Sequence, residues 1–284
     1  MQVARAQMTA PVQVAQNLRA PQLAETVVTA TRSEQPLSDL VADVSIVDRE
    51  TIESSGATGV ADLLARLPGV EITRNGGVGN ASSVYLRGAE QRFTAVYIDG
   101  VRVDSQSTGG ALWEQIPPSQ IERIEVLRGP AAAVYGSDAI GGVIQLFTRK
   151  GEGPAAPYVG VGLGNQGTRK IAAGVSGTAG PDGALDYAVG LAHARSSGFD
   201  SKTRGAHNPD DDGYDSTSGS ARVDYRINAQ HKIGASLLSS RLDSGYDAYG
   251  YLPSAPVDDR NQHRLRTVGA HWDAQWSDVY STRV

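Results

Sequence analysis

Acidic and amide side chains gather in two stretches of this 284-residue sequence. They are Asp200, Asn208, Asp210, Asp211, Asp212 and Asp215 in residues 196–216, and Asp243, Asp247, Asp258 and Asp259 in residues 243–264. From Asn208 the order Asn-x-Asp-x-Asp-Gly repeats the first half of an EF-hand calcium loop. The twelfth position is Gly219 instead of glutamate, which disfavours an EF-hand. Oxygen ligands at alternate positions still suit Ca²⁺ chemically.

The mutual repulsion of these carboxylates leaves two alternatives. Two carboxylates about 4 Å apart repel by about 4 kcal/mol at an effective dielectric constant of 20. The loops therefore either stay loose, with the charges spread in water, or fold around a cation. Composition alone favours the solvated alternative.

Other chemistries find little support in the sequence. The glycine-rich loops at 75–80 and 105–110 lack the Gly-Lys-Ser/Thr ending of a phosphate loop, so we expect no nucleotide site. The five histidines show no metal-ligand spacing, cysteine is absent, and Ser137 lies in no nucleophile elbow, so we do not expect an enzyme. A net charge of −5 with no basic face argues against a nucleic-acid partner.

The acidic stretches lie between segments that alternate apolar and polar residues. Six such segments are expected as antiparallel strands at 157–164, 168–177, 184–195, 217–228, 231–242 and 265–276. Most have the roughly 9–11 residues that a tilted strand needs to cross a bilayer. One face of each would meet outer-membrane lipid and the other a polar lumen. The connections alternate between short (178–183, 229–230) and long (196–216, 243–264), and the long ones are expected outside the cell. The first connection, 165–167, should also lie outside but is tiny.

Residues 33–150 read as a separate α+β module. We expect strands at 44–47, 70–73, 83–87, 95–98, 123–127 and 143–148, and a tight turn at Asp99-Gly100. A helix is predicted over about 58–67, capped by Thr58 and stopped by Pro68-Gly69, because Val60, Leu63, Leu64 and Leu67 recur with helical spacing.

The N-terminal part has two segments. Residues 1–24 are a Pro-, Gln- and Ala-rich tail expected to be mobile. Ala4-Arg5-Ala6 is similar to the end of a signal peptide, so the start is expected to lie inside a longer precursor, the alternative being an unstructured leader. Residues 25–31 (Glu25, Thr26, Val27, Val28, Thr29, Ala30 and Thr31) suit an extended strand with nothing local to pair with.

Several motifs in the module resemble those of a known family. They are Leu67-Pro68-Gly69-Val70, Val84-Tyr85-Leu86-Arg87-Gly88, Val96-Tyr97-Ile98-Asp99-Gly100-Val101, Ile124-Glu125-Val126-Leu127-Arg128-Gly129-Pro130, and the run from Ala133 to Ile144. This order resembles the plug domain of TonB-dependent outer-membrane receptors, and residues 25–31 resemble the TonB box of the members that transport cobalamin.

The resemblance implies a plug inside a membrane β-barrel of about 22 strands. The expected organisation is a leader (1–24), a TonB box (25–31), a plug (33–150) and the N-terminal part of the barrel (157–284), in the outer membrane of a Gram-negative cell with the N-terminus in the periplasm. Six strands cannot close around such a plug, so we expect a partial barrel that does not transport alone.

The resemblance also implies sites. In the cobalamin-transporting members, calcium orders the outer loops, and the coordinating positions fall on Asp200, Asn208, Asp210, Asp212, Tyr246, Asp247 and Asp258. Substrate contacts fall on Ala81, Ser83, Glu90, Thr108, Gly109 and Ala248. Asn208 replaces a glutamine and Glu90 an asparagine, which weakens the case for Glu90. The implied function is TonB-driven uptake of cobalamin or a related corrinoid. The alternative cargo is a siderophore, haem or another metal complex.

Overall fold

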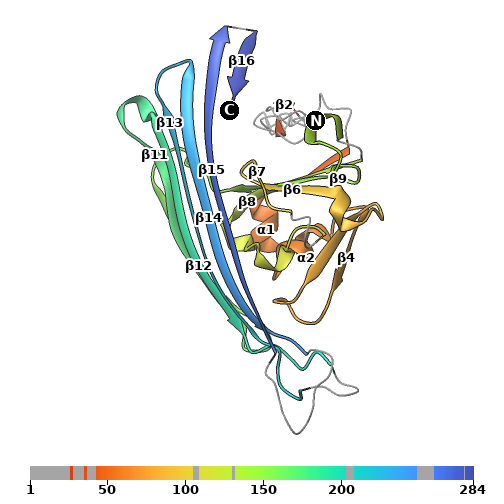
Figure 1. The fold of residues 1–284 in the computed structure, drawn as a ribbon. Coiled ribbons are helices and arrows are strands. Elements are labelled where there is room, and N and C mark those ends of the chain that lie inside the picture. Colours follow the sequence, from red (N-terminus) through yellow and green to blue (C-terminus); the bar gives the residue numbers. More distant parts are fainter. Residues whose placement is uncertain are drawn as a thin grey trace, which may run out of the picture.

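The chain folds into a small α+β module that lies against one face of a long curved sheet (Figure 1). The computed structural model describes residues 26–27, 35–36, 43–104, 109–129, 132–202, 208–247, 259–277 and 279–284. Among these residues, no helix has both the length and the apolar character needed to cross a membrane.

A five-stranded mixed sheet forms the centre of the module. Its order is β3 (Asp43–Val47), β8 (Ile121–Arg128), β9 (Gly142–Thr148), β6 (Thr94–Ile98) and β7 (Val101–Arg102). Only β6 and β9 pair in parallel. The predicted turn between β6 and β7 is confirmed: Asp99 and Gly100 both have positive φ (47° and 83°), as a two-residue hairpin turn of this twist requires.

The rest of the module packs around this sheet. A second hairpin pairs β4 (Val70–Arg74) with β5 (Ser82–Leu86). The helices are α1 (Arg49–Ser54), α2 (Val60–Leu64) and α3 (Ala132–Tyr135), with 3₁₀ turns η2 (Gln91–Phe93), η3 (Trp113–Gln115) and η4 (Pro118–Gln120). Helix α2 buries Val60, Leu63 and Leu64 in the core that it shares with β4, β5 and β8.

Two features of the predicted helical region are wrong. Helix α2 is shorter than 58–67, and Thr58 does not cap it: Gly59 is the N-cap, and both Thr58 Oγ1 and the Gly59 N–H donate to Asp62. Helix α1 was not predicted. Asp48 caps it by accepting a hydrogen bond of 2.8 Å from the Thr51 N–H.

The large sheet contains seven antiparallel strands within the described residues, paired in sequence order. They are β10 (Ala156–Leu163), β11 (Arg169–Ala179), β12 (Leu185–Ser196), β13 (Tyr214–Arg226), β14 (His231–Gly245), β15 (Arg260–Ser277) and β16 (Tyr280–Arg283). We call this sheet the wall. A 3₁₀ turn, η5 (Pro181–Gly183), joins β11 to β12. The six predicted segments are confirmed as strands, whereas β16 was not predicted.

The strands run further into the acidic stretches than predicted. Strand β13 begins at Tyr214, β14 extends to Gly245, and β15 begins at Arg260. The long connections therefore shorten to 197–213 and 246–259. Asp215 and Asp243, which the sequence pattern assigns to loops, lie opposite each other in the ladder of β13 and β14. Their backbone is therefore fixed by the sheet.

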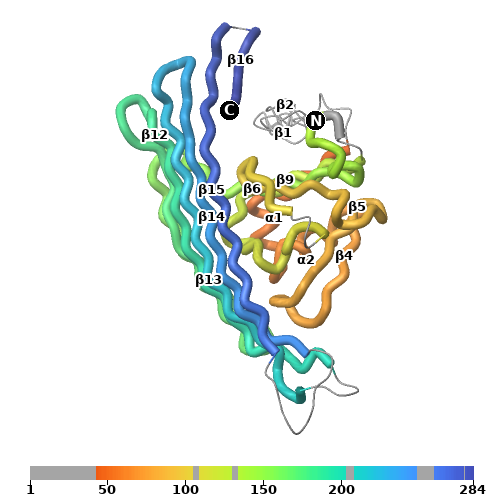
Figure 2. The backbone as a smooth tube through the Cα atoms, viewed as in Figure 1, coloured from red at the N-terminus to blue at the C-terminus, as the bar shows by residue number. Residues whose placement is uncertain are grey.

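The wall lies along one side of the module (Figure 2), and buried and exposed side chains alternate along β14 and β15. Leu238 is fully buried in the core of the module, and Leu265 packs against it. Gly190 and Gly269 permit close approach: a Cβ on Gly190 would lie 2.6 Å from the Tyr158 hydroxyl and 2.8 Å from Gln120 Oε1, and one on Gly269 would lie 3.1 Å from Val101. The wall thus curves past the module, and its other face leaves Val161, Leu191 and Val268 exposed.

The extended segment near the N-terminus has a local partner. Thr26–Val27 (β1) pairs antiparallel with Gln35–Pro36 (β2). The expectation that nothing local pairs with 25–31 is therefore wrong for these two residues. Glu25 and Val28 to Thr31 lie outside the described residues.

Candidate functional site

The two long connections meet at one end of the wall. Asp247 Oδ1 accepts a hydrogen bond of 3.0 Å from the Asn208 N–H, which joins 246–259 to 197–213. The Tyr246 N–H donates to the Asp259 carbonyl at 3.0 Å. Asp247 Oδ2 is buried and has no hydrogen-bond partner within the described residues. An unpaired buried carboxylate oxygen is costly, so this atom is suited to a cation or a bound donor.

The other acidic candidates spread through the first loop. Asp212 is 6% exposed and accepts hydrogen bonds from the N–H and the hydroxyl of Ser201. Asp200 Oδ1 accepts from the Lys202 N–H at 3.0 Å, and Asp210 is exposed. Asp258 lies outside the described residues. Within the part of the chain that the structure describes, no three His, Asp or Glu side chains are grouped as metal ligands.

A loop of the module lies directly beneath these acidic loops. Ser244 at the end of β14 donates a hydrogen bond of 2.9 Å from its hydroxyl to the Gly79 carbonyl. The Asn80 amide, in the orientation that satisfies both of its groups, donates to the Gly245 carbonyl and accepts from the Gly77 N–H, each at 3.2 Å. Residues 75–81, which we call the apical loop, are therefore fixed to the wall where the acidic loops begin.

The predicted substrate contacts fall into two groups. Ala81 is exposed at the end of the apical loop, and Ser83 follows on β5 opposite Thr73. Glu90 lies beyond the other end of β5, roughly 15 Å away by the rise of a strand. It forms an exposed ion pair of 2.8 Å with Arg92, and its neighbour Gln91 lies against Gly109 and Gly110. Thr108 and Ala248 lie outside the described residues.

Polar contacts that were not predicted hold the module against the wall. Asp99 Oδ1 accepts from Arg222 on β13 at 3.2 Å and from the Thr148 N–H at 3.0 Å. Ser220 donates to Gln120 Oε1 at 2.7 Å in a buried contact. Asp99 had been recognised only as a turn residue. Its partner Arg222 could have been found as a lumen-facing charge in the alternation of β13, but not as a partner of Asp99.

One partly buried carboxyl of the module, that of Glu114, has too few hydrogen bonds to offset the cost of its burial. Burial raises the pKa of Glu114 above its usual range, although the Ser82 N–H donates to this carboxylate at 3.3 Å. Its other oxygen, Oε1, has no hydrogen-bond partner within the described residues. Glu114 lies on η3, a turn that also contacts β14 and β15, so its charge influences the interface between module and wall.

Comparisons with known proteins agree with this architecture. The family model "TonB-dependent Receptor Plug Domain" matches residues 36–143. The vitamin B12 transporter BtuB of Photobacterium profundum is 38% identical over 225 residues, which cover 79% of this chain and 36% of the relative. The protein of the same name from Vibrio vulnificus is 33% identical over 238 residues, 81% of this chain and 38% of the relative. The chain thus spans little more than a third of the length of these relatives.

Solved structures show the same fold. The ferripyoverdine receptor of Pseudomonas aeruginosa matches with a TM-score of 0.74 and 16% identity, over 91% of this chain and 35% of that chain. The siderophore receptor PirA of Acinetobacter baumannii matches with a TM-score of 0.66 and 23% identity, over 82% and 38%. At these identities the likeness shows the fold alone. The matched plug motifs, the curved wall and the sequence relatives together place this chain in the family of TonB-dependent outer-membrane receptors, where it resembles the vitamin B12 transporters.

Proposed function

We propose that this chain forms the plug and the first wall strands of a receptor that takes up cobalamin, or a related corrinoid, through the outer membrane. The sequence relatives support the cargo, since two proteins named vitamin B12 transporters match about four fifths of the chain. The single structural observation that carries the proposal is the apical loop held by Ser244 beneath the two acidic loops. A polar cargo bound there contacts plug and wall together.

Among the residues that the structure describes, β10 and β16 are the two edge strands of the wall, and each pairs with a strand on one side only. Unpaired backbone groups in lipid cost several kcal/mol each. We therefore propose that uptake needs the complete receptor, in which further strands pair with these edges and supply the remaining cargo contacts.

Energy for uptake is proposed to come from TonB through residues 25–31. TonB would add this segment as a strand to its own sheet, a mode that depends on backbone hydrogen bonds. The local pairing of β1 with β2 supports this, because it demonstrates that Thr26 and Val27 adopt an extended backbone. Pro36 in β2 has no N–H to donate, which limits the strength of the local pair.

Calcium is proposed to order the two acidic loops. Asp200, Asn208, Asp210, Asp212, Tyr246, Asp247 and Asp258 would hold it, and the buried, unpaired Asp247 Oδ2 fits such a role. The ion would supply positive charge that offsets the repulsion among these carboxylates. The hydrogen bond between Asn208 and Asp247 already brings the two loops together.

Calorimetry of the complete receptor with cyanocobalamin, in buffer that contains calcium, tests the cargo. We expect saturable binding with one site per receptor. A ferric siderophore and haem, titrated under the same conditions, should give no saturable heat. If the siderophore or haem binds saturably and cyanocobalamin does not, the proposed cargo is wrong and the ligand that binds is the cargo.

A further inference from the structure

The outward face of the wall changes from apolar to basic toward the end that carries the long loops. Leu237 on β14 and Val268 on β15 are directly opposite each other and are 40% and 67% exposed, whereas their neighbour Leu238 is buried against the plug. Odd-numbered residues of β14 and even-numbered residues of β15 therefore face outward here. Leu237 and Val268 belong to the apolar surface expected to contact lipid.

Three arginines follow immediately on the same face. The next outward pair joins Ser239 to Arg266, and the one after it joins Arg241 to Arg264. All three arginine side chains are exposed. Arg241 and Arg264 lie directly opposite each other, an arrangement of like charges that destabilises a sheet unless an anion lies between them.

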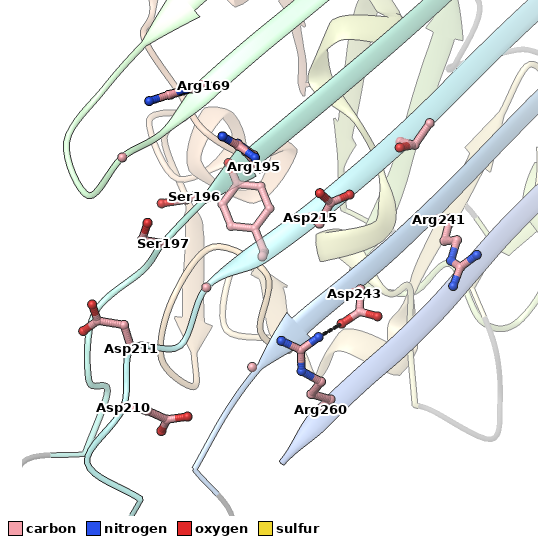
Figure 3. A pocket seen from close by; sticks show the side chains of 15 residues that line it. Arg169, Arg195, Ser196, Ser197, Asp210, Asp211, Asp215, Arg241, Asp243 and Arg260 are labelled. Atoms are coloured by element: carbon pink, nitrogen blue, oxygen red, sulfur yellow. Dashed lines mark hydrogen bonds and ion pairs between the residues drawn. The ribbon is translucent and has the colours of Figure 1, made fainter. Parts of the chain in front are cut away.

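Asp243, the next carboxylate on this face, has other partners. Asp243, one outward position further along β14, accepts from Arg260 at 3.3 Å and from the Gln262 amide at 2.9 Å. Figure 3 shows this pair beside Arg241, at the rim of a depression of about 790 Å³. Across the described ranges, no carboxylate lies within ion-pair distance of Arg241, Arg264 or Arg266. The three guanidinium groups are thus available to an external anion.

The other boundary of the apolar surface lies on the same strand. Trp272 and Trp276 face outward on β15 and stack edge to face with ring centroids 5.9 Å apart. Tryptophans of this kind mark the interface between lipid and water. Trp276 lies ten positions after Arg266, which is about 33 Å along a strand and about 25 Å along the membrane normal at the usual tilt. That distance matches the apolar band of outer-membrane barrels, so the arginines lie at the level of lipid headgroups.

We propose that Arg241, Arg264 and Arg266 form a binding site for the phosphate of a membrane-lipid headgroup. Guanidinium groups bind phosphate oxygens in bidentate fashion, and a phosphate between Arg241 and Arg264 removes their mutual repulsion. The hydroxyl of Ser239 on the same face offers a further donor. The acyl chains then cover Leu237 and Val268. A lipid fits better than a soluble anion because the site adjoins the apolar surface directly.

Native mass spectrometry of the complete receptor in detergent tests this proposal. The probe is dimyristoyl phosphatidic acid, and dimyristoylglycerol, with the same chains and no phosphate, is the reference. We expect the phosphate lipid to bind and the triple variant Arg241→Gln, Arg264→Gln, Arg266→Gln to bind it about 100-fold more weakly. The triple lysine variant should keep most of the affinity because it keeps the charge. Arg260→Gln is the matched control on the same strand and face, since Asp243 already engages Arg260, and it should bind as the parent does.

Three results would overturn the proposal. The first is equal affinity of the parent and the triple glutamine variant for phosphatidic acid. The second is equal binding of dimyristoylglycerol and phosphatidic acid. The third is displacement of the lipid by inorganic phosphate at concentrations similar to those of the lipid, which would assign the site to a soluble anion. If the triple glutamine variant does not fold, the triple lysine variant decides: an affinity for phosphatidic acid about 100-fold below that of the parent would also reject the proposal.

Discussion

Gly79 lies where the plug contacts the end of the wall that carries the acidic loops. A Cβ at this position would lie 2.7 Å from the Ser244 Cβ and 2.8 Å from the Tyr214 Cβ, both on wall strands. Gly77, two residues earlier in the apical loop, has no such restriction, because its nearest neighbour would be the Asp212 carbonyl oxygen at 3.5 Å. The absence of one methyl group at residue 79 therefore permits the hydrogen bond from Ser244 to the plug.

We expect Gly79→Ala to detach the apical loop from β13 and β14, because overpacking of this kind costs about 2 kcal/mol. Amide hydrogen exchange should rise in residues 75–81 and near Ser244, and cyanocobalamin affinity should fall at least tenfold. Gly77→Ala is the matched control and should leave both quantities close to those of the parent. Similar exchange rates in the two variants would contradict the proposed anchor.

At the scale of elements, the segment proposed to bind TonB begins as a strand of only two residues. Strand β1 pairs with β2 through Thr26 and Val27 alone among the described residues, and Pro36 contributes no donor. So short a ladder opens readily, since few hydrogen bonds are lost. TonB, bound as proposed, would therefore compete for the same backbone groups.

We expect Val28→Pro to block uptake of radiolabelled cobalamin by cells while surface binding stays at the parental level. Proline removes an N–H from the segment that TonB is proposed to add as a strand to its own sheet. Val28→Ala keeps the N–H and should transport normally. Normal uptake by the proline variant would show that residues 25–31 are not the coupling segment.

The elements that sequence patterns predicted best are those with a strong two-residue alternation. Residues 221–228 alternate strictly, and β13 indeed passes through 221–226. The alternation weakens where outward positions become charged, as at Asp243 and Arg260, so the strand ends there were missed. Helix α1 was missed because its six residues contribute one buried side chain, Ile52, and no periodic pattern.

Candidate site residues were less predictable than strands. The acidic composition indicated which loops to examine, but the hydrogen bond between Asn208 and Asp247 joins residues 39 positions apart. Neither a motif nor a spacing encodes such a contact. The contact of Gln120 with Ser220 spans 100 positions and depends on how the plug sits beside the wall.

At the scale of the whole molecule, the plug, the apical loop and the acidic loops form one connected structure. The plug contacts the wall through Asp99 and Arg222, and it contacts the end of the wall that carries the acidic loops through Gly79 and Ser244. A change in the conformation of the acidic loops would therefore also change the position of the apical loop beneath them. Calcium, as proposed, would act on cargo binding through this connection.

Removal of calcium with EDTA should weaken cyanocobalamin binding by the complete receptor at least tenfold, and added calcium should restore it. Asp247→Asn keeps a carbonyl oxygen for the Asn208 N–H but removes a charge, so we expect this variant to need more calcium for the same affinity. Asp215→Asn, an exposed carboxylate outside the proposed set, should respond as the parent does. Calorimetry that shows no effect of EDTA would reject the calcium proposal.

The missing side chains at Gly190 and Gly269 also set how closely the plug and the wall can pack. A Cβ on Gly190 would lie 2.8 Å from Gln120 Oε1 of the plug, and a Cβ on Gly269 would lie 3.1 Å from the Val101 side chain. A larger residue at either position would therefore have to displace these side chains or move the plug away from the wall.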